Sequence, residues 1–128
     1  MGSYGFAAVG IGASLGAWLR WWLGNFFNAV FPTIPLGTLA ANLLGGYLVG
    51  VAVAFFGRHS SLAPEARLFV VTGFMGGLTT FSTFSAEVVN LIGLAQYGWA
   101  LVAASVHLFG SLVLTALGIV SFKLLAGA

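Results

Sequence analysis

One stretch of ten residues, GGLTTFSTFS at positions 76–85, combines two glycines, five hydroxyl side chains and two phenylalanines. It lies inside a run apolar enough to cross a membrane, where a polar group is costly unless it is paired or lines a wet path. Glycine weakens a helix, and non-helical backbone at this depth is tolerated only where it is buried in protein or lines a cavity. A break would free carbonyl oxygens for a small cation and N–H groups for an anion. The stretch is therefore predicted to be an ion site.

The two phenylalanines of this stretch, Phe81 and Phe84, are three residues apart and share one face of a helix. The edge of an aromatic ring is positive. Two such edges with hydroxyls nearby offer an anion weak and reversible partners that carry no fixed charge, as conduction requires. The alternative, that both rings are core residues of a helix bundle, is equally compatible with the sequence.

Four further polar side chains are candidates for contact with an ion. Asn42 can donate its amide to an anion or bridge two helices, and the sequence favours neither use. Arg20 can extend to the headgroups or line an aqueous vestibule, where it raises the local anion concentration. Glu87, the only acidic residue in a predicted span apart from Glu65 at the start of the third, can pair with Arg20 or cap a vestibule. His107 is more often a packing residue than a proton relay.

The composition indicates an integral membrane protein. Of the 128 residues, 60% are hydrophobic and 5% are charged, and the mean hydropathy is +1.09. A soluble domain carries about 25% charged residues. With no cysteine, two carboxylates and two histidines, the chain has few groups for metal or acid–base catalysis. The net charge of +2 includes no basic cluster, so nucleic-acid binding is unsupported.

The apolar runs predict an all-α membrane protein of four transmembrane helices in a single domain, residues 1–128. A span needs about 20 predominantly apolar residues. The predicted spans are residues 4–30, 36–56, 64–95 and 99–125. Four spans place both termini on the same side of the membrane, and the third contains the predicted break. The few basic residues orient the chain only weakly.

Glycines also recur four residues apart, as in Gly12/Gly16, Gly46/Gly50 and Gly73/Gly77. This spacing lets membrane helices approach one another closely. We expect close packing to be the use of most of them, while Gly73, Gly76 and Gly77 also weaken the third helix where the hydroxyls begin.

Four sequence stretches, one in each predicted helix, resemble the Fluc (CrcB) fluoride channels. They are GASLGAWLRW (12–21), GTLAANLLGGYLVG (37–50), TGFMGGLTTFSTFSAE (72–87) and GSLVLTALG (110–118). The resemblance covers essentially the whole chain. It implies four-helix subunits assembled as a dual-topology, antiparallel homodimer, which exports toxic fluoride passively across the bacterial inner membrane. It also implies two pores, each built with residues from both subunits.

The resemblance further assigns roles to residues of this chain. Asn42 matches a pore asparagine, and Phe81 and Phe84 match paired pore phenylalanines. The polar track along the pore is matched by Ser82, Thr83, Ser111 and Thr115.

Three more side chains and two backbone positions complete what the resemblance implies. Arg20 matches a vestibule arginine, while Glu87 and His107 fit the region of the pore ends. Gly76 and Thr79 match the positions whose backbone carbonyls, two from each subunit, hold a central structural sodium ion that is not transported.

Two other readings compete with a channel. A small proton-coupled exporter is also a four-helix dual-topology subunit, but it needs an ionisable group at mid-membrane. The first predicted helix has no acid, Glu87 lies past the break, and His107 is the only spare candidate. A non-transporting scaffold explains the glycines but not the cluster of donors. An enzyme is least favoured, because no nucleophile, base and acid set is visible.

Overall fold

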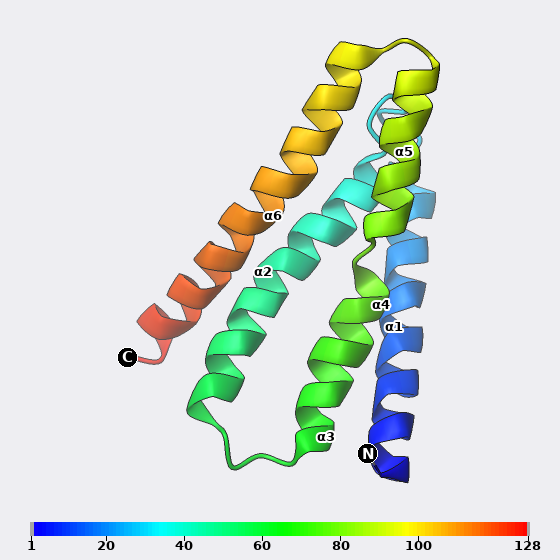
Figure 1. Ribbon diagram of the computed structural model, residues 1–128. Helices are drawn as coiled ribbons and strands as arrows, with labels where there is room; N and C mark the ends of the chain where they lie inside the picture. The colour runs from blue at the N-terminus through cyan, green and yellow to red at the C-terminus, as the bar shows by residue number, and fades with distance from the viewer. Residues whose placement is uncertain (1, 128) are drawn as a thin grey trace.

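The computed structural model describes residues 2–127, and every regular element in that range is a helix (Figure 1). The elements are α1 (Ser3–Phe27), α2 (Leu36–Arg58), α3 (Pro64–Arg67), the π-helix η1 (Leu68–Met75), α4 (Gly76–Leu78), α5 (Phe81–Gly93) and α6 (Tyr97–Leu125). In Figure 1 the chain runs up α1, down α2, up through α3 to α5 and down α6. Both ends of the chain therefore lie toward the lower half of that view.

Three helical stretches are long and apolar enough to cross a membrane: α2, the combined run Pro64–Gly93, and α6. Helix α1 has the length of a span, with 25 residues, but it carries Arg20 and Asn25 and is not among these three. The predicted all-α membrane fold is confirmed. The first of the four predicted spans stays a prediction.

The predicted break in the third span is present, but it lies after the glycines and not at them. Gly76 has helical backbone angles (φ −62°, ψ −38°). Thr79 (φ −85°, ψ 154°) and Thr80 (φ −149°, ψ 120°) are extended. The expectation that the glycines themselves break the helix is therefore wrong.

Two threonines make the break. The Thr79 hydroxyl donates to the carbonyl of Met75, 2.8 Å away, which already accepts the Thr79 N–H at 3.0 Å. The Thr80 hydroxyl accepts the N–H of Thr83 at 3.1 Å. Threonine is favoured at this N-cap position because its side-chain oxygen satisfies an N–H that the first turn leaves free. The first threonine thus ends α4 and the second begins α5.

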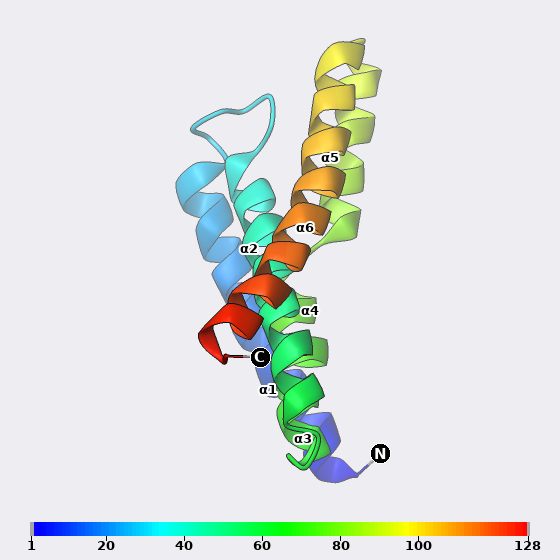
Figure 2. The same ribbon diagram turned by 90° about the vertical axis from the view of Figure 1, so that its left-hand side faces the viewer.

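The glycines instead let helices touch through their backbones. A methyl group on Gly16 of α1 would collide with the carbonyl oxygen of Phe74, and one on Gly77 would collide with that of Ala13. On the other side of the bundle, a methyl on Gly118 of α6 would collide with the Tyr47 carbonyl of α2. These contacts confirm close packing as the use of most of the glycines that are spaced four residues apart. They join α1 to η1 and α4, and α2 to α6, which cross at an angle in Figure 2.

Two small apolar clusters flank the break along the third span. Leu78, just before the break, is fully buried with Leu23 of α1 and Ala41 of α2. Leu91, beyond the break on α5, is buried against Ile34 of the α1–α2 connection and two alanines of α6. The extended residues therefore lie between two packed contacts that hold α4 and α5 in place.

We predict that Gly16→Ala destabilises the protein by about 1–3 kcal/mol, because the added methyl overpacks the contact of α1 with η1 and α4. Unfolding by denaturant in detergent measures the effect. The matched control is Gly10→Ala on the same helix, where a Cβ meets nothing within 4 Å. It should be neutral, or stabilising by about 0.5–1 kcal/mol, since alanine favours a helix over glycine. Equal effects of the two substitutions would contradict the packing role.

Candidate functional site

Asn42, in the first half of α2, bridges the break in the third span. Its Oδ1 accepts the N–H of Thr80 at 2.7 Å, and its Nδ2 donates to the carbonyl of Thr80 at 3.0 Å. The second Nδ2 hydrogen is directed to Nδ1 of His107, 3.0 Å away. Of the two uses that the sequence allows for Asn42, the structure displays the bridge, which joins α2, the break and α6.

His107 is buried, with 4% of its surface exposed, and does not lie at an end of the bundle. Its ring stacks on Phe84 with centroids 4.5 Å apart. Because Nδ1 accepts from Asn42, a neutral ring carries its hydrogen on Nε2. Nε2 is buried and has no hydrogen-bond partner among the described residues. The site therefore contains one buried donor that the chain itself does not use.

Phe81 and Phe84 lie together on one side of α5, as their spacing predicts. Their centroids are 5.5 Å apart and the rings meet edge to face, with 76° between their planes. Phe84 is half-buried, whereas Phe81 is 78% exposed. Ser82 is also exposed, with its hydroxyl 3.5 Å from that of Thr80. The aromatic pair thus opens onto the outer surface of the chain.

A polar stripe runs along α6 below the stacked rings. His107, Ser111 and Thr115 recur every four residues and so share one face of the helix. The Thr115 hydroxyl donates to the carbonyl of Gly46 on α2, at 2.9 Å. Ser111, between them, is partly buried. The stripe faces α2. Along α6 the buried imidazole of His107 comes first, and the hydroxyls of Ser111 and Thr115 come one and two turns later.

Arg20 lies beside the break and not at the surface. Its Nε donates to the carbonyl of Gly77 at 3.1 Å. The last carbonyls of a helix have no partner within it, so this bond satisfies one of the groups that the end of α4 leaves open. Arg20 also lines a polar cavity of about 220 Å³. The other lining residues are Trp21, Gly24, Asn25, Asn28, Thr38, Thr80 and Thr83.

Glu87 is hydrogen-bonded to Thr38 and not to Arg20. The Thr38 hydroxyl donates to Glu87 Oε2 at 2.7 Å, and the Thr38 N–H donates to Oδ1 of Asn28 at 3.0 Å. Sequence reasoning missed Thr38, Asn28 and Thr80. In the sequence, Asn28 and Thr38 lie on either side of the short connection that contains Pro32 and Pro35. That position alone does not indicate that the two residues are hydrogen-bonded.

The carbonyl oxygens of Gly76 and Thr79 are among those that lose their helical donors at the break. In an α-helix the Gly76 carbonyl accepts from the N–H of Thr80, and that of Thr79 accepts from the N–H of Thr83. Here the Thr80 N–H donates to Oδ1 of Asn42, and the Thr83 N–H donates to the hydroxyl oxygen of Thr80. The carbonyls of Gly76 and Thr79 are therefore free for another partner. No group of three or more acidic, histidine or cysteine side chains lies together within residues 2–127.

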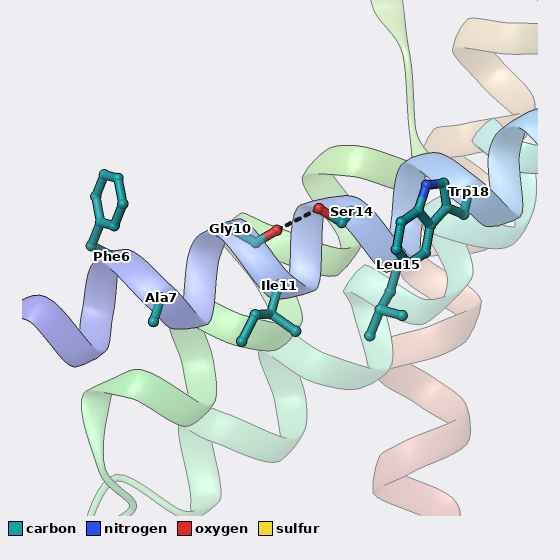
Figure 3. A pocket seen from close by; sticks show the side chains of 7 residues that line it. All are labelled: Phe6, Ala7, Gly10, Ile11, Ser14, Leu15 and Trp18. Atoms are coloured by element: carbon teal, nitrogen blue, oxygen red, sulfur yellow. Dashed lines mark hydrogen bonds between the residues drawn. The ribbon is translucent and has the colours of Figure 1, made fainter.

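A second hollow lies on the outer side of α1 and does not belong to this site (Figure 3). It measures about 470 Å³ and is lined by Phe6, Ala7, Gly10, Ile11, Ser14, Leu15 and Trp18. The only hydroxyl in it, that of Ser14, donates to the carbonyl of Gly10 on its own helix at 2.9 Å. No polar groups converge there, so the groove is an apolar outer surface.

Comparison with known proteins gives a consistent set of relatives. The model of a family described as "CrcB-like protein, Camphor Resistance (CrcB)" matches residues 7–119. A protein of Nitrosospira multiformis named fluoride-specific ion channel FluC is 62% identical over 126 residues, which cover 98% of each chain. A protein of the same name from Cupriavidus necator is 60% identical over 98% of this chain and 100% of its own. One from Pseudomonas putida is 57% identical over 94% of each chain.

We predict that Asn42→Leu destabilises the protein, because the Thr80 N–H, the Thr80 carbonyl and His107 Nδ1 all lose a partner. Each buried polar group left unsatisfied costs about 1–3 kcal/mol. Denaturant unfolding in detergent measures the loss, and hydrogen exchange at the Thr80 amide should accelerate. Asn90→Leu, at an exposed position of α5, is the control. Unchanged exchange at Thr80 in a folded Asn42→Leu protein would contradict the bridge.

Proposed function

This chain belongs to the CrcB-like (Fluc) family, a family of fluoride channels and not of enzymes, and on that premise we propose that it conducts fluoride passively across the bacterial inner membrane. Export of cytoplasmic fluoride by this route relieves fluoride toxicity. The names of its relatives and the apolar helices of the chain support the proposal.

The observation that carries the proposal is the buried Nε2 hydrogen of His107, which has no hydrogen-bond partner within residues 2–127. Fluoride is small and strongly hydrated, so its path must replace the hydrogen bonds of water with protein donors. His107 Nε2 lies beside the ring of Phe84 and above Ser111 on the same helix face. A neutral donor at that depth binds an anion without holding it permanently, as conduction requires.

In the proposed path, the residues act in a definite order. Arg20 in the polar cavity raises the local anion concentration. The hydroxyls of Ser82 and Thr83 and the edges of Phe81 and Phe84 then receive the ion, and His107 and Ser111 continue the path along α6. The one hydroxyl hydrogen of Thr115 is donated to the Gly46 carbonyl, so Thr115 holds α6 against α2 at the end of the path. Both Nδ2 hydrogens of Asn42 are engaged in the chain. We therefore assign Asn42 the role of holding the break and orienting His107, in place of the direct contact with fluoride implied by the resemblance.

One chain leaves the proposed path open on one side, because Phe81 and Ser82 are exposed. A second, antiparallel copy in the membrane would cover this face and complete two equivalent pores. A two-fold axis applies the same surface twice, so each copy closes the pore of the other. This arrangement requires both insertion orientations, which is compatible with the weak charge bias of the sequence.

The two freed carbonyls, those of Gly76 and Thr79, fit a structural sodium ion in the same assembly. Carbonyl oxygens are suitable ligands for a hard cation, and Gly76 is exposed. One copy offers two such oxygens, and an antiparallel pair offers four around the axis. The ion would neutralise the carbonyl dipoles of both breaks and hold the two copies together, without being transported.

The first test is fluoride efflux from liposomes, followed with a fluoride electrode. We expect fast efflux with fluoride and none with chloride. Phe81→Ile, which removes one ring edge, should slow the flux by about tenfold, since about 1.4 kcal/mol on a barrier is a factor of ten. The matched control is Phe6→Ile, because Phe6 is similarly exposed, at 83%, but lies on the outer groove of α1.

Two outcomes would favour the alternatives. Absence of efflux from folded wild-type dimers in sodium would exclude the channel and leave a scaffold. Flux that requires a pH gradient would identify a small dual-topology proton-coupled exporter, with His107 as the ionisable group.

The sodium proposal has its own test. Replacing sodium by N-methylglucamine on both sides of the membrane should reduce fluoride efflux by at least about tenfold, because a bulky organic cation cannot approach four carbonyl oxygens. Adding sodium back should restore the flux. Full efflux after exhaustive removal of sodium would exclude a structural ion at the break.

A further inference from the structure

We propose that Asn28 is a positioning residue that holds Thr38 against Glu87 and thereby keeps the carboxylate from repelling anions in the polar cavity. The inference rests on the proposed function, because it concerns how an anion enters the conduction path. No residue of the sequence motifs points to Asn28, and its role follows from two hydrogen bonds that link α1, α2 and α5 and from the cavity that they border.

The first contact is a helix cap supplied from a distance. Helix α2 begins after Pro35, which provides no side-chain cap. The first N–H groups of a helix have no partner within it. Oδ1 of Asn28, at the end of α1, accepts one of them, the N–H of Thr38, at 3.0 Å. The backbone N–H of Asn28 is itself fixed by the carbonyl of Gly24 at 3.1 Å. The amide is thus held from α1 and directed at α2.

The side-chain amide of Asn28 is closely surrounded by two glycines, Gly24 and Gly37. A Cβ on Gly37 would lie 2.6 Å from Asn28 Oδ1 and 2.6 Å from the Cα of Gly24. A Cβ on Gly24 would lie 3.2 Å from Asn28 Nδ2. Two glycines therefore leave room for one asparagine side chain between α1 and α2. Such close packing restricts the amide to the orientation that reaches Thr38.

The second step passes from Thr38 to the carboxylate. Thr38 is 5% exposed, and its hydroxyl has a single hydrogen to donate. That hydrogen goes to Glu87 Oε2 at 2.7 Å, a well-formed O–H···O bond. Because Asn28 fixes the backbone of Thr38, it also fixes the direction of this donation.

The third step concerns the cavity. Asn28, Thr38 and Arg20 line the same polar hollow of about 220 Å³, and Thr83 of that lining lies one helical turn before Glu87. A positive group there attracts anions, whereas a carboxylate that turned into the hollow would repel them and pair with Arg20. Glu87 is not among the lining residues. Its hydrogen bond from Thr38 holds the negative charge outside the hollow, so that Arg20 remains available to the anion.

The test is a pair of double-mutant cycles, in which Asn28 or Thr38 is substituted with and without Glu87→Gln. The measured quantity is the initial rate of fluoride efflux at low ionic strength. Asn28→Ala and Thr38→Val should each slow efflux by roughly tenfold, the lower end of electrostatic steering effects. Thr38→Ser, which keeps the hydroxyl, should restore most of the rate. In a Glu87→Gln background, neither Asn28→Ala nor Thr38→Val should slow efflux further, because the repulsive charge is gone. Asn90→Ala, at an exposed position on α5, is the control.

An equal slowing by Asn28→Ala with and without the Glu87 charge would overturn the inference, because a structural cap alone acts regardless of that charge. The same conclusion follows if raising the salt concentration leaves the deficit of Asn28→Ala unchanged, since screening weakens electrostatic effects.

A second readout needs no conduction and separates this inference from the proposed function. The chain has two acidic side chains, Glu65 and Glu87, so Glu65→Gln with ¹³C-labelled glutamate isolates Glu87 in the infrared spectrum. Its carboxylate band should shift in Asn28→Ala as it does in Thr38→Val. An unshifted band in Asn28→Ala overturns the inference. Absence of fluoride efflux from the wild type, with the band shift present, overturns only the proposed function.

Discussion

The paired hydrogen bonds between the Asn42 amide and the backbone of Thr80 are the interaction on which the site depends. A backbone that leaves helical geometry inside a membrane must find partners for its N–H and its carbonyl within the protein. Asn42 supplies both to Thr80. Because the Thr80 N–H is thereby engaged, the Gly76 carbonyl is left free. The break is therefore a stable feature of the fold, and α5 begins in a fixed orientation beyond it.

The same amide connects the break to the buried imidazole. By donating to Nδ1 of His107, Asn42 selects the neutral tautomer in which Nε2 carries the hydrogen. Phe84 stacks on that ring and stands on α5, whose start is set by Thr80. One asparagine thus orders a backbone break, a donor and an aromatic face, which together form the centre of the proposed path.

The charged side chains of the site are held at its edge, each by a neutral group. Arg20 donates to the Gly77 carbonyl, and Glu87 accepts from Thr38. Conduction requires binding that is weak enough for the ion to leave, and a negative charge within the path would repel an anion. The close packing at glycines makes these contacts possible. The approach of α1 at Gly16 lets Arg20 reach the end of α4, and the approach of α6 lets Thr115 reach the Gly46 carbonyl.

The sequence by itself determined the all-α membrane class, the presence of a break in the third span and the shared face of Phe81 and Phe84. These follow from hydropathy and helical period, which are local properties of the chain. The structure moved the break from the glycines to Thr79 and Thr80. Helix propensity is a weak preference that tertiary contacts override, and here α1 packs on Gly77 while the two threonine hydroxyls end α4 and cap α5. The tertiary structure also decided which use Asn42 has, placed His107 in the interior and made Thr38 the hydrogen-bond partner of Glu87.

Those choices join residues 38, 65 and 49 positions apart. No local pattern specifies such partners, because several donors and acceptors of the same kind are available along each helix. Only the packing of α1 on α4 and of α2 on α6 brings one of them within hydrogen-bonding distance, and so only the tertiary structure decided which groups are satisfied and which remain free for an ion.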